Sequence, residues 1–246
     1  MGLGRRRGFY TTSVDHGKTW SEPVDISSQV HMDMHSARPE VDARTWAFAP
    51  GHGLQLTHGP YAGRLFVPAN HSLGPPQTDF ADYQTYGCYS DDHGATWQMS
   101  PEVKVPSSNE SMAAQSPDGQ MLLTVRIQNQ GTKRKLMARS LDGGQTWDST
   151  WLASDLPTPM CQSSICYIQG PERGAFYQVG PADTATRSQL TLWSSEHGGQ
   201  LWQKEAVLYE GPAAYSDMVS LGDIELGVLF ERDDYREIVF QRVALP

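Results

Sequence analysis

The sequence is poor in cysteine. Its three cysteines, Cys88, Cys161 and Cys166, are an odd number and form no C-x-x-C pattern. A disulfide between Cys161 and Cys166 is one alternative, and buried free thiols, which we favour, are the other. Cysteine usage therefore leaves the cellular compartment open.

Basic residues and long apolar runs are scarce as well. The 246 residues include 19 Lys and Arg against 28 Asp and Glu, which gives a net charge of −9. This balance argues against nucleic acid as a partner, because a phosphate backbone calls for clustered basic side chains. No stretch approaches the length of apolar residues needed to cross a bilayer. The start, "MGLGRRRGFYTTS", has charges but no apolar region of a signal peptide, and the localisation stays unknown.

Helical periodicity of useful length is absent, and short strand-like runs dominate. Runs such as "GRLFVPANH", "QMLLTVRIQ" and "SQLTLWSS" alternate apolar with polar residues and are bounded by Gly, Pro, Asn and Asp. The pair Asp118-Gly119 in "SPDGQMLLTVR" predicts a hairpin turn. With 38% hydrophobic residues and no visible linker, the chain can bury a sizeable core as one domain or as part of a larger one. The sequence predicts an all-β protein.

A short motif of Ser, Asp, Gly, Thr and Trp recurs along the chain. It is spelled "SVDHGKTW", "SDDHGATW" and "SLDGGQTW", and a degenerate copy, "SEHGGQLW", keeps the serine, one glycine and the tryptophan. The aspartate position falls at 15, 92, 142 and 197, and spacings of about fifty residues or more indicate structural repeats. Asp-x-Gly is turn chemistry, because the carboxylate caps backbone N–H groups and glycine allows a positive φ. One carboxylate per copy is too few for a calcium loop, so we interpret the motif as a structural turn.

The repeats predict a β-propeller. Many short strands, one turn motif per fifty-odd residues and 23 glycines fit blades of four strands. The longer first interval predicts one blade plus an insertion, with "VHMDMHSARPE" and "HSLGPPQTDFADYQ" as candidate loops. Because a tryptophan is a large apolar anchor, we expect all four motif tryptophans to be largely buried at equivalent positions. They are Trp20, Trp97, Trp147 and Trp202.

The number of repeats predicts an incomplete ring. A propeller must close to cover its edge strands, and about four blades do not easily close at this repeat length. The chain also begins almost on a motif copy. We therefore expect residues 1–246 to be the C-terminal part of one propeller domain, with one or more blades missing in front.

Four residues outside the repeats stand in contexts that composition does not explain. They are Glu110 in "SSNESMAAQSPDG", Arg126 in "LLTVRIQNQ", Arg187 in "TATRSQLTLW" and Tyr215 in "GPAAYSDMVSL". Taken singly, each has an ordinary structural interpretation. A loop glutamate is usually solvated, an arginine in a strand usually faces water, and a tyrosine after Gly-Pro usually packs.

Taken together, these features resemble the exo-α-sialidases. The repeat resembles the Asp-box, Ser-x-Asp-x-Gly-x-Thr-Trp, which in sialidases and some other β-propellers lies between the third and fourth strands of a blade. Glu110, Arg126, Arg187 and Tyr215 match the order and local wording of the family's site residues. The segments "TWAFAPGHGLQL", "GRLFVPANH" and "YSDDHGATW" also resemble its middle blades. The resemblance covers nearly the whole chain and implies a sialidase-type six-bladed β-propeller, here incomplete.

The resemblance implies a glycosidase that releases terminal α-linked sialic acid from glycoproteins, gangliosides and oligosaccharides. Arg126 and Arg187 would bind the carboxylate of sialic acid, for which a planar guanidinium is well suited. Sialidases are the tyrosine-nucleophile exception among retaining glycosidases, since a carboxylate nucleophile would be repelled by the substrate carboxylate. Tyr215 would be the nucleophile and Glu110 its base, because a phenol with a pKa of about 10 needs a partner to attack at neutral pH. The implied reaction passes through a sialyl-tyrosine intermediate and needs no metal or cofactor. Complete family members are often secreted, periplasmic or lysosomal.

The sequence departs from the family pattern in two respects. The family also has a third arginine, in an Arg-Ile-Pro motif, and an aspartate acid/base, both ahead of or within the first blade, and this chain has no "RIP". Residues 5–7, all arginine, directly precede the first Asp-box, so we expect them to belong to a third blade strand. Asp33 and Asp42 follow that box, which is the wrong side for the acid. General-acid help is typically worth about 10² to 10⁴-fold, so we expect the chain as written to be impaired.

Two other functions stay open. One is a non-catalytic propeller that binds sialic acid or is purely structural. The other is an unrelated Asp-box propeller, such as a receptor ectodomain or a glycanase of neutral polysaccharides, although neutral sugars give no reason to gather two arginines with a glutamate and a tyrosine. The sialidase interpretation predicts that Glu110 and Tyr215 lie within hydrogen-bond reach and that Arg126 and Arg187 point into the same cleft.

Overall fold

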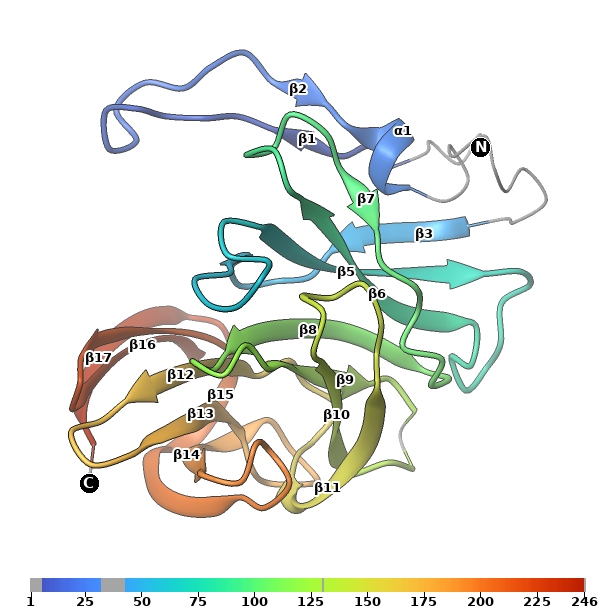
Figure 1. Cartoon of the computed structure of the whole chain (residues 1–246). Coiled ribbons are helices and arrows are strands. Elements are labelled where there is room, and N and C mark those ends of the chain that lie inside the picture. Colours follow the sequence, from blue (N-terminus) through green and yellow to red (C-terminus); the bar gives the residue numbers. More distant parts are fainter. Residues whose placement is uncertain (1–5, 32–42, 130, 246) are drawn as a thin grey trace.

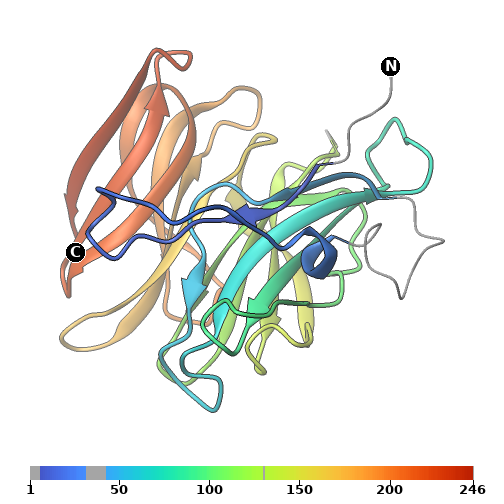
Figure 2. The ribbon, with the colours of Figure 1, turned by 90° about the horizontal axis from the view of Figure 1, so that it is seen from above.

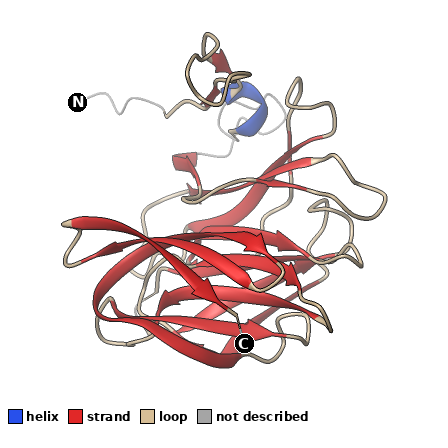
Figure 3. Cartoon of the chain, turned by 90° about the vertical axis from the view of Figure 1, so that its left-hand side faces the viewer, coloured by secondary structure: helices blue, strands red, loops and turns tan. Residues whose placement is uncertain are grey.

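The computed structural model describes residues 6–31, 43–129 and 131–245, and these are almost entirely β-strands and turns (Figure 1, Figure 3). The helix of this part of the chain, α1 (Ser27–Val30), has four residues. No helix in the described ranges is long and apolar enough to cross a membrane. Antiparallel sheets follow one another in sequence order, as the colours of Figure 2 show. The prediction of an all-β fold is confirmed.

The first three sheets are formed by strands that are close in sequence. The hairpin of β1 (Phe9–Tyr10) and β2 (Val24–Asp25) comes first. The next sheet has the order β3-β5-β6-β7, with β4 paired to β5. Its strands are β3 (Ala43–Phe48), β4 (Leu54–Gln55), β5 (Leu65–Leu73), β6 (Tyr83–Ser90) and β7 (Gln98–Met99). The third sheet has the order β11-β10-β9-β8. Its strands are β8 (Ser108–Gln115), β9 (Met121–Ile127), β10 (Arg134–Ser140) and β11 (Ser149–Pro157).

A single long strand joins the last two blades. β15 (Gln203–Gly222) pairs through its first part with β14 and through its second part with β16. Six strands therefore form one continuous sheet in the order β12-β13-β14-β15-β16-β17. The other five are β12 (Ser164–Gln169), β13 (Gly174–Pro181), β14 (Ser188–Ser195), β16 (Glu225–Arg232) and β17 (Glu237–Ala244). The sheets are those of a partial β-propeller, as the repeats predict.

Hydrophobic cores lie between successive blades. Phe66 of β5 and Met121 of β9 are fully buried in the cluster that joins the second sheet to the third. Leu122 of β9 and Phe176 of β13 belong to the cluster that joins the third sheet to the β12–β15 blade. The third sheet thus buries one face against the second sheet and the other against the β12–β15 blade.

The repeated motif is a turn, as we interpreted it. In the second copy the backbone N–H of Gly94 donates to Ser90 Oγ at 2.8 Å, and Thr96 donates its backbone N–H and its hydroxyl to the Asp92 carboxylate at 2.8 and 2.6 Å. The first and third copies make the same three bonds. The degenerate copy keeps only the bond from the glycine N–H to the serine, at 3.0 Å. The aspartates are therefore occupied by their own loops.

The motif glycines also fit the blades together. Gly144 has a φ of +89°, and a Cβ on it would lie 2.4 Å from Phe66 of the preceding blade. Gly199 has a φ of +82°, and a Cβ there would lie 2.4 Å from Leu122. A larger residue would meet both backbone strain and a steric clash at these two positions.

The prediction that all four motif tryptophans are largely buried is wrong. Trp202 is 6% exposed, Trp97 and Trp147 are half-buried, and Trp20 is 62% exposed. The two extremes, Trp20 and Trp202, differ in the amount of sheet beside the indole. Trp202 belongs to the core between two four-stranded blades, whereas Trp20 lies on the two-stranded β1–β2 hairpin. The positions are equivalent in the turn, but not in their surroundings.

Other sequence expectations have mixed outcomes. The three cysteines are free, and Cys88 and Cys161 are buried as expected, whereas Cys166 is only partly buried. Gly119 has a φ of +89° in the turn between β8 and β9, as the hairpin prediction requires. Arg6 and Arg7 precede β1 and are not in a strand. Arg5, Asp33 and Asp42 lie outside the described residues.

Candidate active site

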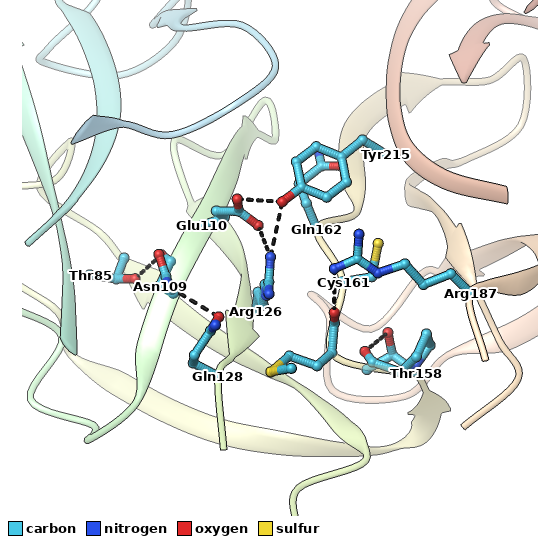
Figure 4. Close-up of polar contacts among 12 residues, drawn as sticks. Thr85, Asn109, Glu110, Arg126, Gln128, Thr158, Cys161, Gln162, Arg187 and Tyr215 are labelled. Atoms are coloured by element: carbon cyan, nitrogen blue, oxygen red, sulfur yellow. Dashed lines mark hydrogen bonds and ion pairs between the residues drawn. The ribbon is translucent and has the colours of Figure 1, made fainter. Parts of the chain in front are cut away.

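Glu110, Arg126 and Tyr215 converge from β8, β9 and β15 (Figure 4). The Tyr215 hydroxyl donates to Glu110 Oε1 at 2.5 Å. Arg126 Nη1 donates to Glu110 Oε2 at 2.6 Å and to the Tyr215 hydroxyl at 2.9 Å. Each of the three side chains therefore contacts the other two, and the predicted convergence of Glu110 and Tyr215 is confirmed.

Shifts in strand register bring two of these side chains to the site. On β8, three residues advance between Ser108 and Ser111 while the partner β9 advances by two, so Glu110 lies in a bulge opposite Arg126. On β15 the register shifts in the same way between Ala213 and Ser216, and Tyr215 lies in that bulge. Bulges are common next to active sites because they turn a side chain away from the regular alternation of a strand.

Burial and charge keep the proton on Tyr215. The ring is half-buried, and this burial, followed by the hydrogen bond to Glu110 and the charge of its carboxylate, raises the pKa of Tyr215 well above its usual value. The positive charge of Arg126 acts in the opposite direction. The phenol is therefore neutral in the resting site, with its proton already directed at a carboxylate oxygen.

Arg187 lies beside this cluster, just before β14. Its Cζ lies 5.6 Å from the centroid of the Tyr215 ring, within the range of a cation–π contact. Arg187 Nη1 donates to the Tyr235 hydroxyl at 2.9 Å, and Nη2 donates to the carbonyl of Met160 at 3.0 Å. Figure 4 shows its guanidinium pointing toward the side of the site where Tyr215 lies. All four residues predicted from the sequence are thus neighbours.

Both arginines keep N–H groups for a ligand. A guanidinium has five N–H donors. Arg126 is 8% exposed and uses Nη1 for both of its bonds, and its buried Nε has no partner among the described residues. Arg187 uses one N–H of each terminal nitrogen. Buried donors without partners favour a ligand with acceptor oxygens.

Sequence reasoning missed the residues that hold the site in place. Gln162, which is 1% exposed, donates Nε2 to the carbonyl of Ser216 at 2.9 Å and accepts the Ser216 N–H at 3.1 Å. It therefore clamps the backbone next to Tyr215. Tyr235 holds Arg187 from the turn between β16 and β17, at a φ of +66°. The sequence signal for Gln162 was the polar run "QSS" directly before an apolar strand, and Tyr235 had none.

Two cavities flank the cluster. One of ≈ 210 Å³ lies on the Glu110 side and is also lined by Arg6, Asn70 and Tyr83. The other, of ≈ 270 Å³, is lined by Tyr215, by Gly51 of the loop between β3 and β4, and by Asp217 and other residues of the last blade. Glu110 and Tyr215 therefore each border space that a ligand could enter.

A third hollow, of ≈ 620 Å³, is lined by Trp202, by the turn that includes Gly170 and by Leu245, which follows β17. None of the four predicted site residues lines it. Size alone is therefore a poor guide to the chemistry in this molecule, because the charged groups with specific contacts are elsewhere.

A histidine–aspartate pair ties two distant segments near Tyr215. His52, between β3 and β4, lies with its Nδ1 2.7 Å from Asp217 Oδ1 on β15. The hydrogen bond to Asp217 raises the pKa of His52, while partial burial opposes the shift. The contact joins the second sheet to the last blade.

Comparisons with known proteins give the family and the fold of the chain. A family model described as "BNR repeat-like domain" matches residues 2–228. The chain is 32% identical to a sialidase of Micromonospora viridifaciens, over 89% of this chain and 33% of that protein. It is 27% identical to Sialidase-2 of Cricetulus griseus, over 99% of this chain and 66% of the relative. The solved structure of the Hadza microbial sialidase Hz136 has a TM-score of 0.79 at 22% identity, over 97% of this chain and 44% of that one, and shows the same fold. The chain thus spans only part of the length of these relatives.

Proposed function

Since the chain belongs to the family of BNR repeat-like domains, and within it to the exo-α-sialidases, we propose that it carries the nucleophilic half of a sialidase active site. Its substrates are glycans that end in an α-linked sialic acid. The reaction is retaining hydrolysis, in which Tyr215 attacks the anomeric carbon and water then releases the sugar. Residues 1–246 form part of a single sialidase propeller domain.

The contact between Tyr215 and Glu110 carries this proposal. As Tyr215 Oη forms a bond to the anomeric carbon, the glycosidic C–O bond breaks and the phenol proton passes to Glu110 Oε1, which lies 2.5 Å away in the resting site. In the second step water attacks the same carbon and gives up a proton to the solvent, the bond from this carbon to Tyr215 Oη breaks, and Glu110 returns the phenol proton to the departing phenolate. Because Arg126 Nη1 donates to both groups, it stabilises negative charge on whichever of them holds it.

The two arginines explain the choice of a phenol nucleophile. Arg126 and Arg187 each keep unused N–H donors next to Tyr215, and planar guanidinium groups suit a carboxylate. A substrate with a carboxylate on its anomeric carbon would be held there, and that charge would repel an anionic nucleophile. Tyr215, which keeps its proton until attack, avoids the repulsion.

The leaving group determines which substrate tests the proposal. An activated aryl sialoside releases a phenolate that needs no protonation, whereas sialyl-lactose releases an alkoxide that does. We expect the purified 246-residue chain to turn over the aryl sialoside, and to hydrolyse sialyl-lactose poorly. Robust hydrolysis of sialyl-lactose would mean that a further acid acts, such as Asp33 or Asp42.

The decisive variant is Tyr215→Phe, which should abolish turnover of the aryl sialoside. Tyr177→Phe is the matched control, because Tyr177 is a half-buried tyrosine on β13 that lies outside the cluster. Undiminished turnover by Tyr215→Phe would refute the proposal.

A sialic-acid-binding module without turnover is the second candidate. The observation that favours it is the pair of arginines with unused donors beside Tyr215, which bind a carboxylate whether or not the glycosidic bond breaks. Binding of free sialic acid by a chain that leaves the aryl sialoside intact would support this candidate over the enzyme.

A further inference from the structure

Lys135 is a lysine in a place where lysines are rare. It is 1% exposed, on β10, whereas lysine is almost never fully buried unless it is paired. Its Nζ donates to the carbonyl oxygen of Cys161 at 2.5 Å. Within the part of the chain that the structure describes, no carboxylate forms an ion pair with it. Burial of an ammonium whose partner is a neutral carbonyl costs free energy, so a functional role would explain why a lysine stands here.

An irregular strand pairing admits this side chain. Arg134 pairs with Pro157 of β11, but the next residue, Lys135, pairs with Ala153. The segment 154–156 of β11 therefore has no partner in register, and the sheet is distorted at the position of Lys135. Such irregularities re-aim side chains next to functional sites.

The carbonyl that Lys135 holds belongs to the segment that holds Arg187. Residues 158–163 connect β11 to β12. The Met160 carbonyl accepts from Arg187 Nη2 at 3.0 Å, and the next carbonyl, of Cys161, accepts from Lys135. The residue after that, Gln162, clamps the backbone beside Tyr215. Three consecutive residues thus link Lys135 to the proposed carboxylate clamp and to the proposed nucleophile.

Lys135 also interacts electrostatically with charged groups of the site. The charged and titratable groups that act on it are the Cys161 thiol, Arg126, Glu110 and Arg187. Burial lowers the pKa of Lys135 to about 7, with Arg126 and Arg187 acting in the same direction. The protonated form adds a third positive charge beside the two guanidinium groups, and it titrates near neutral pH.

We propose that Lys135 is a positioning residue: its ammonium fixes segment 158–163, and through the Met160 carbonyl it sets the orientation of Arg187 for an incoming carboxylate. The carboxylate part of this inference rests on the proposed function. Lys135 touches neither the substrate nor Tyr215, and acts through Arg187 and through its charge. Deprotonation of Lys135 weakens its hydrogen bond to the Cys161 carbonyl and at the same time removes its positive charge.

The first test is binding of free N-acetylneuraminic acid and of its methyl ester, measured by NMR titration. Lys135→Met keeps the apolar length of the side chain and removes the ammonium, and Lys204→Met is the matched control at an exposed position of β15. Because a displaced clamp costs about 10-fold to 100-fold, we expect Lys135→Met to weaken binding of the acid by that factor at about pH 6. Binding of the neutral ester to Lys135→Met should weaken much less. Lys204→Met should bind the acid and the ester with the affinities of the unchanged protein.

The pH profile separates this role from simple support of the fold. The affinity of the unchanged protein for the acid should fall as the pH rises from about 6 to about 8.5, and Lys135→Met should flatten the profile. Lys135→Met with unchanged affinity and an unchanged pH profile, even if it is less stable, would overturn the inference. A profile of the unchanged protein that is already flat over this range would overturn it as well.

A second measurement needs no sugar. In protein labelled with ¹³C, the carbonyl signal of Cys161 should titrate with a midpoint of about 7 in the unchanged chain and should stay constant in Lys135→Met. The Arg187 Nε–Hε signal should shift in that variant. If these signals respond while no sialic acid binds, the proposed function fails and the positioning role stands. If sialic acid binds but the Cys161 signal does not titrate, the positioning role fails alone.

Discussion

The Tyr215 hydroxyl donates to Glu110 Oε1 at 2.5 Å, although 105 positions separate the two residues in the chain. The contact joins β8 to β15 across the site, with Arg126 bonded to both partners. It leaves the phenol protonated at rest, with its proton directed at a carboxylate oxygen. The contact therefore supports the proposed chemistry, in which proton transfer from Tyr215 to Glu110 accompanies attack.

Removal of the acceptor should slow attack. Glu110→Gln keeps the size of the side chain and replaces the carboxylate with a weak base, so we expect kcat for an aryl sialoside to fall by about 10² to 10⁴-fold. Glu22→Gln, on the exposed loop before β2, should leave kcat unchanged. A Glu110→Gln variant within about twofold of the unchanged protein would exclude Glu110 as the base.

Stability in acid should depend on the Asp-box carboxylates. Hydrogen bonds from Thr96 and Ser90 lower the pKa of Asp92 to about 2, below its value of about 3.9 in an unfolded chain. Its contribution to stability is therefore present above about pH 4 and is lost as the pH falls through about 2. Asp92→Asn should lower the free energy of unfolding at neutral pH, and the difference from the unchanged protein should shrink in acid.

Urea denaturation at a series of pH values measures this difference, with Asp223→Asn, at an exposed turn, as the control. A difference that stays constant down to about pH 2 would show that Asp92 acts only through its shape.

The motif tryptophans should differ in their contribution to stability. Trp202 is 6% exposed and Trp20 is 62% exposed. Trp202→Ala should cost about 3 to 5 kcal/mol, as for a buried large-to-small change, and Trp20→Ala less than about 1 kcal/mol, as for a surface change. Equal costs in urea denaturation would show that the turn itself, and not the surrounding sheet, sets the contribution of the indole.

The contribution of the His52–Asp217 hydrogen bond to stability should depend on pH in the opposite direction from that of Asp92. Because the hydrogen bond raises the pKa of His52, its contribution is complete below the unfolded value of about 6.5 and is lost as the pH rises through the folded value. The free energy of unfolding of His52→Asn should therefore fall below that of the unchanged protein at about pH 5.5 and approach it at about pH 8.5. His16→Asn, at an exposed turn, is the control. A difference in the free energy of unfolding between His52→Asn and the unchanged protein that widens as the pH rises would contradict this account.

The turns of the fold could be predicted from the sequence itself. The convergence of the site residues could be predicted only from the resemblance to the sialidases. The Asp-x-Gly pattern predicted the turns correctly because the hydrogen bonds of each turn lie within eight residues, as those of Ser90, Asp92 and Thr96 do. Nothing local placed Glu110 or Tyr215, because both lie in bulges that depend on the register of a partner strand.

Burial was the least predictable property, because it depends on neighbours distant in sequence. Trp20 ends an intact copy of the motif and Trp202 a degenerate one, yet Trp20 is the exposed residue and Trp202 the buried one. Lys135 is buried at the distorted pairing with β11, and nothing in its local sequence indicates that burial. Gln162 and Tyr235 support the site from segments without a recognisable pattern.

Covalent trapping of the nucleophile tests the central claim most directly. A 2,3-difluorinated sialosyl fluoride slows the second step more than the first, so that a glycosyl-enzyme intermediate accumulates and can be located by peptide mass spectrometry. We predict one sugar adduct on the peptide that contains Tyr215, and none in Tyr215→Phe. An adduct on Glu110 or on any other residue, or turnover of the aryl sialoside by a chain that never acquires an adduct at Tyr215, would contradict the account.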